Sequence, residues 1–316
     1  MMEPLKFAPN LRRPRYELDV NHFLSYLTVS NDSQFIAVGG GERITVLDAN
    51  THDTVWTKDF PDGMKFCRFT PDCSYFIYGQ KEMFFVEPGN WDEPKFSFKL
   101  GAKVSSATIS TTGDKVWVGT YDNCLHYFEL GDKGWAHIQK HELATRAKDL
   151  TADPLGRYLV AATKEGAGMA MYDAARLAGA APEGALRPVI DSDLEPEVGC
   201  VGFSPNGKKL VWGGSLTVLM MEVDKPTDIE PLPVDPLRRK TRCLAFSADS
   251  RWVMYGGASR DVTVVDTETL QPLFRVGGFH EGVWNVAFAP GNAWLLACSY
   301  SRQVTVAQLA NTAPPL

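Results

Sequence analysis

Short apolar strands and polar turns alternate along the chain, and one strand-like phrase recurs. Residues 259–266 read SRDVTVVD, residues 301–308 read SRQVTVAQ and residues 42–48 read ERITVLD. Each phrase places an arginine before alternating apolar and polar residues, which is the pattern of a half-buried β-strand. Three copies of such a phrase in 316 residues indicate an internal repeat.

A longer unit occurs seven times: an apolar strand, a turn rich in Ser, Pro, Asp, Asn and Gly, and a second apolar strand. The residues that end the first strand of each unit are Val29, Phe69, Ile109, Leu150, Phe203, Phe246 and Phe288. Their spacings are 40, 40, 41, 53, 43 and 42 residues. A period of about 40 is the length of one four-stranded propeller blade. The pattern therefore predicts an all-β, seven-bladed β-propeller with four-stranded blades.

A second landmark follows 18 to 23 residues after each of these positions and closes an apolar third strand. It is occupied by Asp48, Glu87, Glu129, Asp173, Glu222, Asp266 and Gln308. The pattern resembles the WD-repeat β-propeller family, whose third strand ends in Trp-Asp. No copy keeps the tryptophan, whose position holds Leu47, Val86, Phe128, Tyr172, Met221, Val265 and Ala307. The buried His–Asp–Ser–Trp network of the family is therefore expected to be absent, with apolar packing holding the blades together.

The two ends of the chain are expected to close the ring together. The seventh copy supplies a third strand but no convincing fourth, whereas residues 15–20 read RYELDV and alternate as a half-buried strand does. Val20 lies nine residues before Val29, as Phe60 lies nine before Phe69. We predict that residues 15–20 complete the last blade, so that residues 1–316 form one propeller domain with residues 1–14 as an N-terminal extension.

Residues 174–197 form the one long insertion, placed between the fourth and fifth copies of the repeat. Its first part, AARLAGA, is compatible with a helical turn in the connection between the third and fourth strands of blade 4. Its end carries an acidic run of Asp191, Asp193, Glu195 and Glu197. A solvated loop and a docking element are both open interpretations, since loops on a rigid scaffold often carry function.

Composition limits the remaining function classes. The chain is 44% hydrophobic and 22% charged with a net charge of −6, which is typical of a globular protein and gives no global reason to expect nucleic acid. No apolar run approaches the roughly 20 residues of a membrane helix, and the N-terminus lacks the apolar stretch of a secretory signal. We therefore expect an intracellular, cytoplasmic protein without membrane insertion.

Signatures of chemistry are scarce. The six cysteines form no CxxC pair and have no histidine at metal-ligand spacing, and Cys67, Cys200, Cys243 and Cys298 lie in apolar runs. The chain has no GxSxG, HExxH or Walker sequence, and its glycine pairs follow strands without a helix to face an anion. We expect no metal, no cofactor and no catalytic residue.

Candidate binding residues come from the turns. Arg43, Arg260 and Arg302 occupy matching places after the second strand of blades 1, 6 and 7, which are neighbours in a closed ring. The connection that enters blade 6 adds a further basic run at the same face, consisting of Arg238, Arg239, Lys240 and Arg242. Either these arginines close their own turns, or they bind an acidic partner segment or phosphate groups through the guanidinium fork.

Two inner-strand residues also stand out. Trp284 begins the innermost strand of blade 7, where it is either core or an exposed binding anchor. Lys148 falls where other blades have apolar or small residues, so blade 4 is bulged there or Lys148 reaches into the channel.

The resemblance implies a non-catalytic scaffold for protein–protein interaction, present as a monomeric propeller within a larger hetero-complex. One alternative is an RNA- or nucleoprotein-associated subunit that binds phosphates through a basic face. A less favoured alternative is an enzyme with a site in the axial channel. Fold alone does not choose among them.

Overall fold

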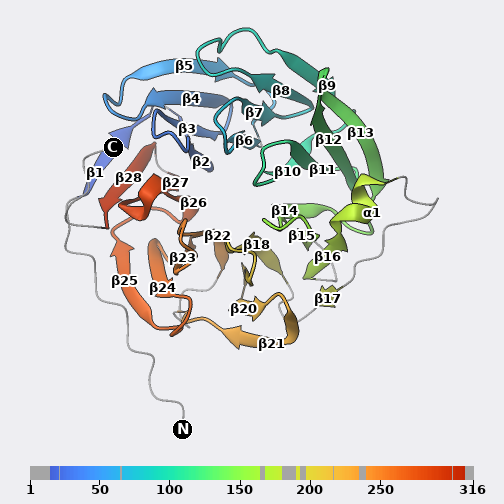
Figure 1. The fold of residues 1–316 in the computed structure, drawn as a ribbon. Helices are drawn as coiled ribbons and strands as arrows, with labels where there is room; N and C mark the ends of the chain where they lie inside the picture. Colours follow the sequence, from blue (N-terminus) through green and yellow to red (C-terminus); the bar gives the residue numbers. More distant parts are fainter. Residues whose placement is uncertain are drawn as a thin grey trace.

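Seven four-stranded antiparallel sheets form a closed ring in the computed structural model (Figure 1). The structure describes residues 15–20, 22–64, 66–163, 168–179, 190–192, 197–215, 217–234, 240–300 and 302–309. Within these residues the innermost strand of every blade contacts the innermost strands of its two neighbours, including β26 with β2. The predicted seven-bladed propeller is confirmed.

Each blade is a meander that runs from the channel outward. Blade 1 contains β2 (Tyr26–Val29), β3 (Phe35–Gly40), β4 (Arg43–Asp48) and β5 (Thr54–Asp59). Blade 2 contains β6 (Phe66–Phe69), β7 (Phe76–Gly79), β8 (Glu82–Val86) and β9 (Phe96–Lys99). Blade 3 contains β10 (Val104–Ile109), β11 (Lys115–Thr120), β12 (Cys124–Gly131) and β13 (Gly134–Glu142). Blade 4 contains β14 (Ala147–Ala152), β15 (Tyr158–Thr163), β16 (Met169–Asp173) and β17 (Ile190–Ser192).

The second half of the chain continues in the same order. Blade 5 contains β18 (Val198–Phe203), β19 (Lys209–Gly214), β20 (Val218–Glu222) and β21 (Lys225–Pro231). Blade 6 contains β22 (Thr241–Phe246), β23 (Trp252–Gly257), β24 (Asp261–Asp266) and β25 (Pro272–Gly277). Blade 7 contains β26 (Val283–Phe288), the 3₁₀ turn η1 (Pro290–Asn292), β27 (Trp294–Ser299), β28 (Gln303–Gln308) and β1 (Arg15–Asp19).

The N-terminal strand completes the last blade, as the sequence predicts. β1 pairs antiparallel with β28, with Leu18 opposite Val304 (Figure 1). Leu18 and Val20 are buried in an apolar cluster that also contains residues of β3 and β27. Ring closure therefore leaves blade 7 with a paired outer strand instead of an unpaired sheet edge.

The apolar core is divided among the blade interfaces. Among the described residues, seven buried clusters each draw side chains from two neighbouring blades. Tryptophans of the second strands contribute to them: Trp117, Trp212 and Trp294 are buried, and Trp252 packs against the cluster of blades 6 and 7. The alternation of apolar residues in each strand thus fills the space between sheets rather than one central core.

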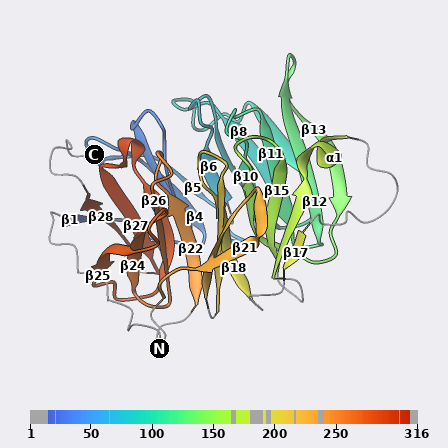
Figure 2. The same cartoon turned by 60° about the horizontal axis from the view of Figure 1, so that its bottom comes forward.

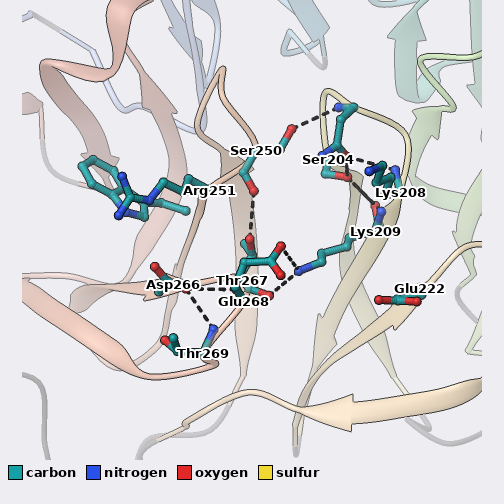
Figure 3. A network of polar contacts seen from close by, with 12 residues as sticks. Ser204, Lys208, Lys209, Glu222, Ser250, Arg251, Asp266, Thr267, Glu268 and Thr269 are labelled. Atoms are coloured by element: carbon teal, nitrogen blue, oxygen red, sulfur yellow. Dashed lines mark hydrogen bonds and ion pairs between the residues drawn. The ribbon is translucent and has the colours of Figure 1, made fainter.

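Polar contacts also join the blades, so the expectation that apolar packing alone holds them is incomplete. Lys209 of β19, an almost buried lysine, donates to the Thr267 carbonyl of blade 6 and forms an ion pair of 2.8 Å with Glu268 (Figure 3). The Ser250 hydroxyl accepts from the Asn206 backbone at 3.0 Å in the same junction (Figure 3). These contacts lie between the turns of neighbouring blades, where a lost partner would leave a buried charge unpaired.

Blade 4 differs from its predicted phase by two residues. In blades 3, 5, 6 and 7, the residue after the first strand donates its backbone N–H across the first turn, and the equivalent bond in blade 4 runs from Asp153 to the Tyr158 carbonyl. The residue that ends the first strand is therefore Ala152, not Leu150. Because alanine is small, it does not mark the end of an apolar strand in the sequence. The larger Leu150 is therefore matched to the strand-end residues of the other blades instead.

The insertion contains part of blade 4. Helix α1 (Ala174–Ala178) begins at Asp173, whose carboxylate accepts from the Ala175 and Arg176 backbone. Leu177 of α1 is fully buried, and its carbonyl lies 2.8 Å from His141 Nε2 of β13, so the helix covers the outside of blade 3 (Figure 2). β17 is the fourth strand of blade 4, so these two parts are blade structure rather than loop. No helix in the described residues is long and apolar enough to cross a membrane.

Candidate partner-binding surface at the channel mouth

One face of the ring carries both the connections between blades and the turns between second and third strands, because strand direction alternates within every blade. We call it the mouth face. At its centre the innermost strands line a channel of about 1240 Å³. The residues around the channel include Arg68, Asp149, Arg242 and Trp284. Desolvation raises the pKa of Asp149, whose carboxylate accepts from the Val201 backbone at 3.0 Å and so ties two blades together.

Five innermost strands share a β-bulge near the mouth face. The register shift falls on their second residue in each case: Ser105, Lys148, Gly199, Arg242 and Trp284. A bulge places two residues opposite one residue of the neighbouring strand and re-aims a side chain there. Lys148 is therefore in phase with Arg242 and Trp284, and both of its sequence interpretations hold, since it is bulged and lines the channel.

Lys148 is held by an acidic residue of the next connection. Its ammonium lies 3.0 Å from Glu197, which also lies 3.5 Å from Lys240 and accepts from Ser215 at 2.8 Å. The Lys148 hydrogen bond is the largest of the effects that lower the pKa of Glu197 to about 2. Two of the mouth's cations are thus paired within the ring.

The three matching arginines have different surroundings. Arg43 forms a two-pronged ion pair with Asp59 of β5, with Nε–Oδ1 at 2.5 Å and Nη2–Oδ2 at 3.1 Å. Arg260 has a backbone φ of 58° and an exposed side chain, with no carboxylate within ion-pair distance in the described residues. Arg302 is exposed and lies 5.6 Å from the ring centre of Phe23. Arg43 therefore closes its own blade, whereas Arg260 and Arg302 present their guanidinium groups.

Part of the predicted basic sector lies outside the described residues. This applies to Arg238 and Arg239, whereas Lys240 and Arg242 both line the channel. Of the predicted acidic run, only Glu197 has a described side chain. The contacts of Glu197 with Lys148 and Lys240 place it inside the mouth.

Aromatic rings connect the exposed Arg302 with the partly exposed Arg242. The guanidinium of Arg242 lies 4.2 Å from the Trp284 ring centre, and Trp284 lies 5.7 Å from Tyr300. Tyr300 is stacked on Phe23 at 4.9 Å with an interplanar angle of 18°, and Arg302 covers the Phe23 ring. We call Arg302, Phe23, Tyr300, Trp284 and Arg242 the aromatic–arginine ladder. It runs from the edge of the mouth face, where blades 7 and 1 meet, into the channel.

Phe23 and Tyr300 are unusual because they are large apolar side chains left 45% and 49% exposed. Sequence reasoning identifies Arg242, Arg302 and Trp284 but misses these two rings. A weak signal exists in the tyrosine that directly follows the second strand in two blades, Tyr121 and Tyr300. Tyr121 carries a comparable contact, with Arg146 at 4.2 Å from its ring centre.

Local packing fixes the loop that carries Phe23. His22 donates from Nδ1 to the Phe23 carbonyl at 3.1 Å, so its Nε2 accepts from the Thr45 hydroxyl at 2.9 Å. Burial lowers the pKa of His22, which favours this neutral form. A Cβ at Gly40 would approach the Phe23 carbonyl to 2.5 Å, so only glycine lets the loop lie this close to β3.

The arrangement provides chemistry suited to binding a partner. In the described residues, no group of three or more His, Cys, Asp or Glu side chains could hold a metal ion. The ladder offers guanidinium groups held on aromatic rings and apolar ring edges beside them. Such rigid aromatic and arginine positions are the ones that dominate protein-interface energies.

Comparison with known proteins gives one repeat and one relative. Residues 271–306, which cover β25 to most of β28, match the family model described as "WD domain, G-beta repeat". Over 116 residues, or 36% of this chain, the sequence is 25% identical to the meiotic recombination protein rec14 of Schizosaccharomyces pombe (strain 972 / ATCC 24843). The match spans 35% of the length of that relative.

Seven four-stranded blades define the class of this protein, a β-propeller, and the repeat recognised over residues 271–306 supports a propeller of the WD-repeat kind. Propellers of this family generally serve as platforms for protein–protein interaction.

Proposed function

We propose that this propeller is a non-catalytic interaction scaffold that binds partner proteins through the mouth face at blades 6, 7 and 1, as a subunit of a larger assembly. The observation that carries the proposal is the exposure of Phe23 and Tyr300 beside the guanidinium group of Arg302, which has no carboxylate partner in the described residues. Exposed large apolar residues rimmed by polar groups mark interaction sites.

Two further observations support the proposal. All six cysteines are free thiols and five of them are buried, which fits a reducing compartment and a cytoplasmic location. The ring is closed through β1, so the mouth face is held by a continuous set of blade interfaces. A binding surface on such a scaffold needs little ordering when a partner docks.

The experiment starts from the native assembly. Partners that co-purify with the full chain are identified by mass spectrometry, and the tightest is reconstituted with purified protein. Changing Arg43, Arg260 and Arg302 together to glutamate is expected to weaken binding at least tenfold and to abolish its salt dependence, because the face changes sign. The matched control replaces Arg251, an exposed arginine of the opposite face, with glutamate.

Thermal melting separates binding from folding in the same variants. Loss of the Arg43–Asp59 pair is expected to cost little, because solvent and salt screen exposed ion pairs. Unchanged affinity in the triple variant would remove the mouth face from the proposal, and a collapse of the melting temperature would show that the arginines are structural.

A further inference from the structure

The ladder is already stacked on itself. Tyr300 stacks on the Phe23 ring, and Arg302 lies over the same ring. Trp284 contacts both Tyr300 and Arg242. Ring faces are the surfaces on which nucleotide bases stack. The Phe23 and Tyr300 faces that stack on each other are engaged, and guanidinium groups lie over Phe23 and Trp284, so guanidinium N–H groups and ring edges are available to a partner.

Both exposed features have the same electrostatic sign. The edge of an aromatic ring carries positive partial charge, and the guanidinium groups carry full charge. Arg242 and Arg302 have no carboxylate partner in the described residues, whereas Lys148, Lys240 and Arg43 are paired with Glu197 or Asp59. In the described part of the mouth, cations without an ion-pair partner therefore lie at the two ends of the ladder and at Arg260, with Arg68 at the channel and Arg146 beside Tyr121 as further separate charges.

A few separated cations suit carboxylates better than a phosphate backbone. Proteins that bind nucleic acid through phosphates commonly neutralise about 6–10 of them, along a continuous basic groove. Here the net charge is −6, and several basic side chains of the mouth are neutralised by their own acidic neighbours. Charge complementarity at this site thus favours a short acidic segment of a protein.

From these observations, and resting on the proposed function, we propose that the ladder binds an acidic peptide segment of a partner protein. One carboxylate is bound by Arg242 at the channel and a second by Arg302 at the edge, with apolar side chains of the segment against the edges of Phe23 and Tyr300. Stacking on Trp284 and Phe23 holds each guanidinium in place before binding, so less side-chain entropy is lost.

The ladder also limits the spacing of the acidic residues. Its four steps of 5.6, 4.9, 5.7 and 4.2 Å place the two guanidinium centres at most about 20 Å apart. An extended chain rises about 3.3 Å per residue. In an extended segment the two acidic positions are therefore separated by no more than about six residues.

Selection from a random octapeptide display library against the purified full chain tests the proposal without assuming a sequence. Selected peptides are expected to be enriched in Asp or Glu at two positions, and a synthetic peptide of the winning sequence should lose binding when those positions become Asn or Gln. An oligothymidylate of eight nucleotides with the same label serves as the nucleic-acid probe and is expected to bind more weakly.

Arg242→Lys and Arg302→Lys distinguish a stacked fork from simple charge. Both variants keep the charge but lose the planar fork, so each is expected to weaken the selected peptide about tenfold, whereas Arg251→Lys changes nothing. Tyr300→Ala should weaken binding with an unchanged melting temperature, and Phe23→Ala provides a second variant if Tyr300→Ala does not fold.

Several outcomes would overturn the proposal. These are failure to select any peptide, selection without acidic enrichment, tighter binding of the oligothymidylate, and wild-type affinity in both lysine variants. If the native partner is nevertheless lost on changing Arg43, Arg260 and Arg302 to glutamate, the scaffold function stands and only the acidic-segment inference fails. If the native partner is retained, the proposed function fails first.

Discussion

At the scale of single residues, burial decides which ionisable groups respond to pH. His126 of β12 and His137 of β13 share a hydrogen bond of 3.1 Å, and His126 is 2% exposed. Burial is the main cause that lowers the pKa of His126 to about 4, and the charge of His137 adds to it. Lys140 lowers this pKa further and Asp122 opposes it. The pair is therefore neutral and structural at pH 7.

Stability is expected to fall as the pH drops from about 6.5 towards 4. In that window the unfolded chain binds a proton at His126 and the folded chain does not, so the proton favours unfolding. With screening at the strand edge, the effect on the free energy of unfolding is roughly 1 kcal/mol at pH 5. Urea denaturation at pH 7 and pH 5 measures it.

Two variants isolate this contribution. His126→Phe should make the free energy of unfolding less dependent on pH over the same range, whereas replacement of the exposed His280 by Gln should not. A pH dependence that persists in His126→Phe would assign the effect to other groups.

At the scale of elements, glycines at the ends of second strands let the connections between blades lie against the sheets. A Cβ at Gly257 would approach the Lys240 carbonyl to 2.0 Å, directly beside the strand that carries Arg242. The glycine pairs are visible in the sequence, where the pattern indicates only tight turns. These glycines also allow the mouth-face loops to pack closely. This role cannot be predicted without knowing where a chain segment distant in sequence lies.

Gly257→Ala is expected to displace the connection that enters blade 6. Overpacking of this kind typically costs about 1–3 kcal/mol, and the shift of Arg242 should weaken partner binding as well. Gly131→Ala is the matched control, because nothing lies within 4 Å of a Cβ built there. Thermal denaturation and a binding titration measure the two effects, and equal behaviour of the two variants would contradict the explanation.

Ring closure gives a second prediction for elements. Deleting residues 1–20 removes β1 and uncovers the apolar side of β28, so the loss of stability should be on the order of several kcal/mol. Deleting residues 1–14 keeps β1 and is the control. Melting of the longer deletion within a degree or two of the intact chain would exclude β1 as a structural strand.

The elements also show what the sequence can and cannot predict. The period of about 40 residues and the acidic ends of third strands are local, repeated signals, and they predict seven blades and closure by residues 15–20. The phase of blade 4 fails because Ala152 is too small to be a landmark. The bulges at Lys148, Arg242 and Trp284 are occupied by a different residue type in each blade, so no shared residue in the sequence reports them.

At the scale of the whole molecule, the ring brings together residues that no local pattern connects. Phe23 comes from the start of the chain, Arg242 from blade 6, and Trp284, Tyr300 and Arg302 from blade 7. Closure through β1 makes the ends of the chain neighbours, and the ladder crosses that junction. The candidate site is thus a consequence of the closed ring, and its aromatic members could not be assigned before the ring was known.

The central claim is that partners bind the mouth face at blades 6, 7 and 1, and hydrogen–deuterium exchange of the free and partner-bound chain tests it most directly. Binding is predicted to protect residues 22–25, 240–244, 283–286 and 297–300, which contain the ladder and its supporting loops. The turns of the opposite face, at residues 30–34, 204–208 and 247–251, are predicted to exchange as in the free chain. Protection confined to those opposite turns, with the mouth face unchanged, would contradict the account.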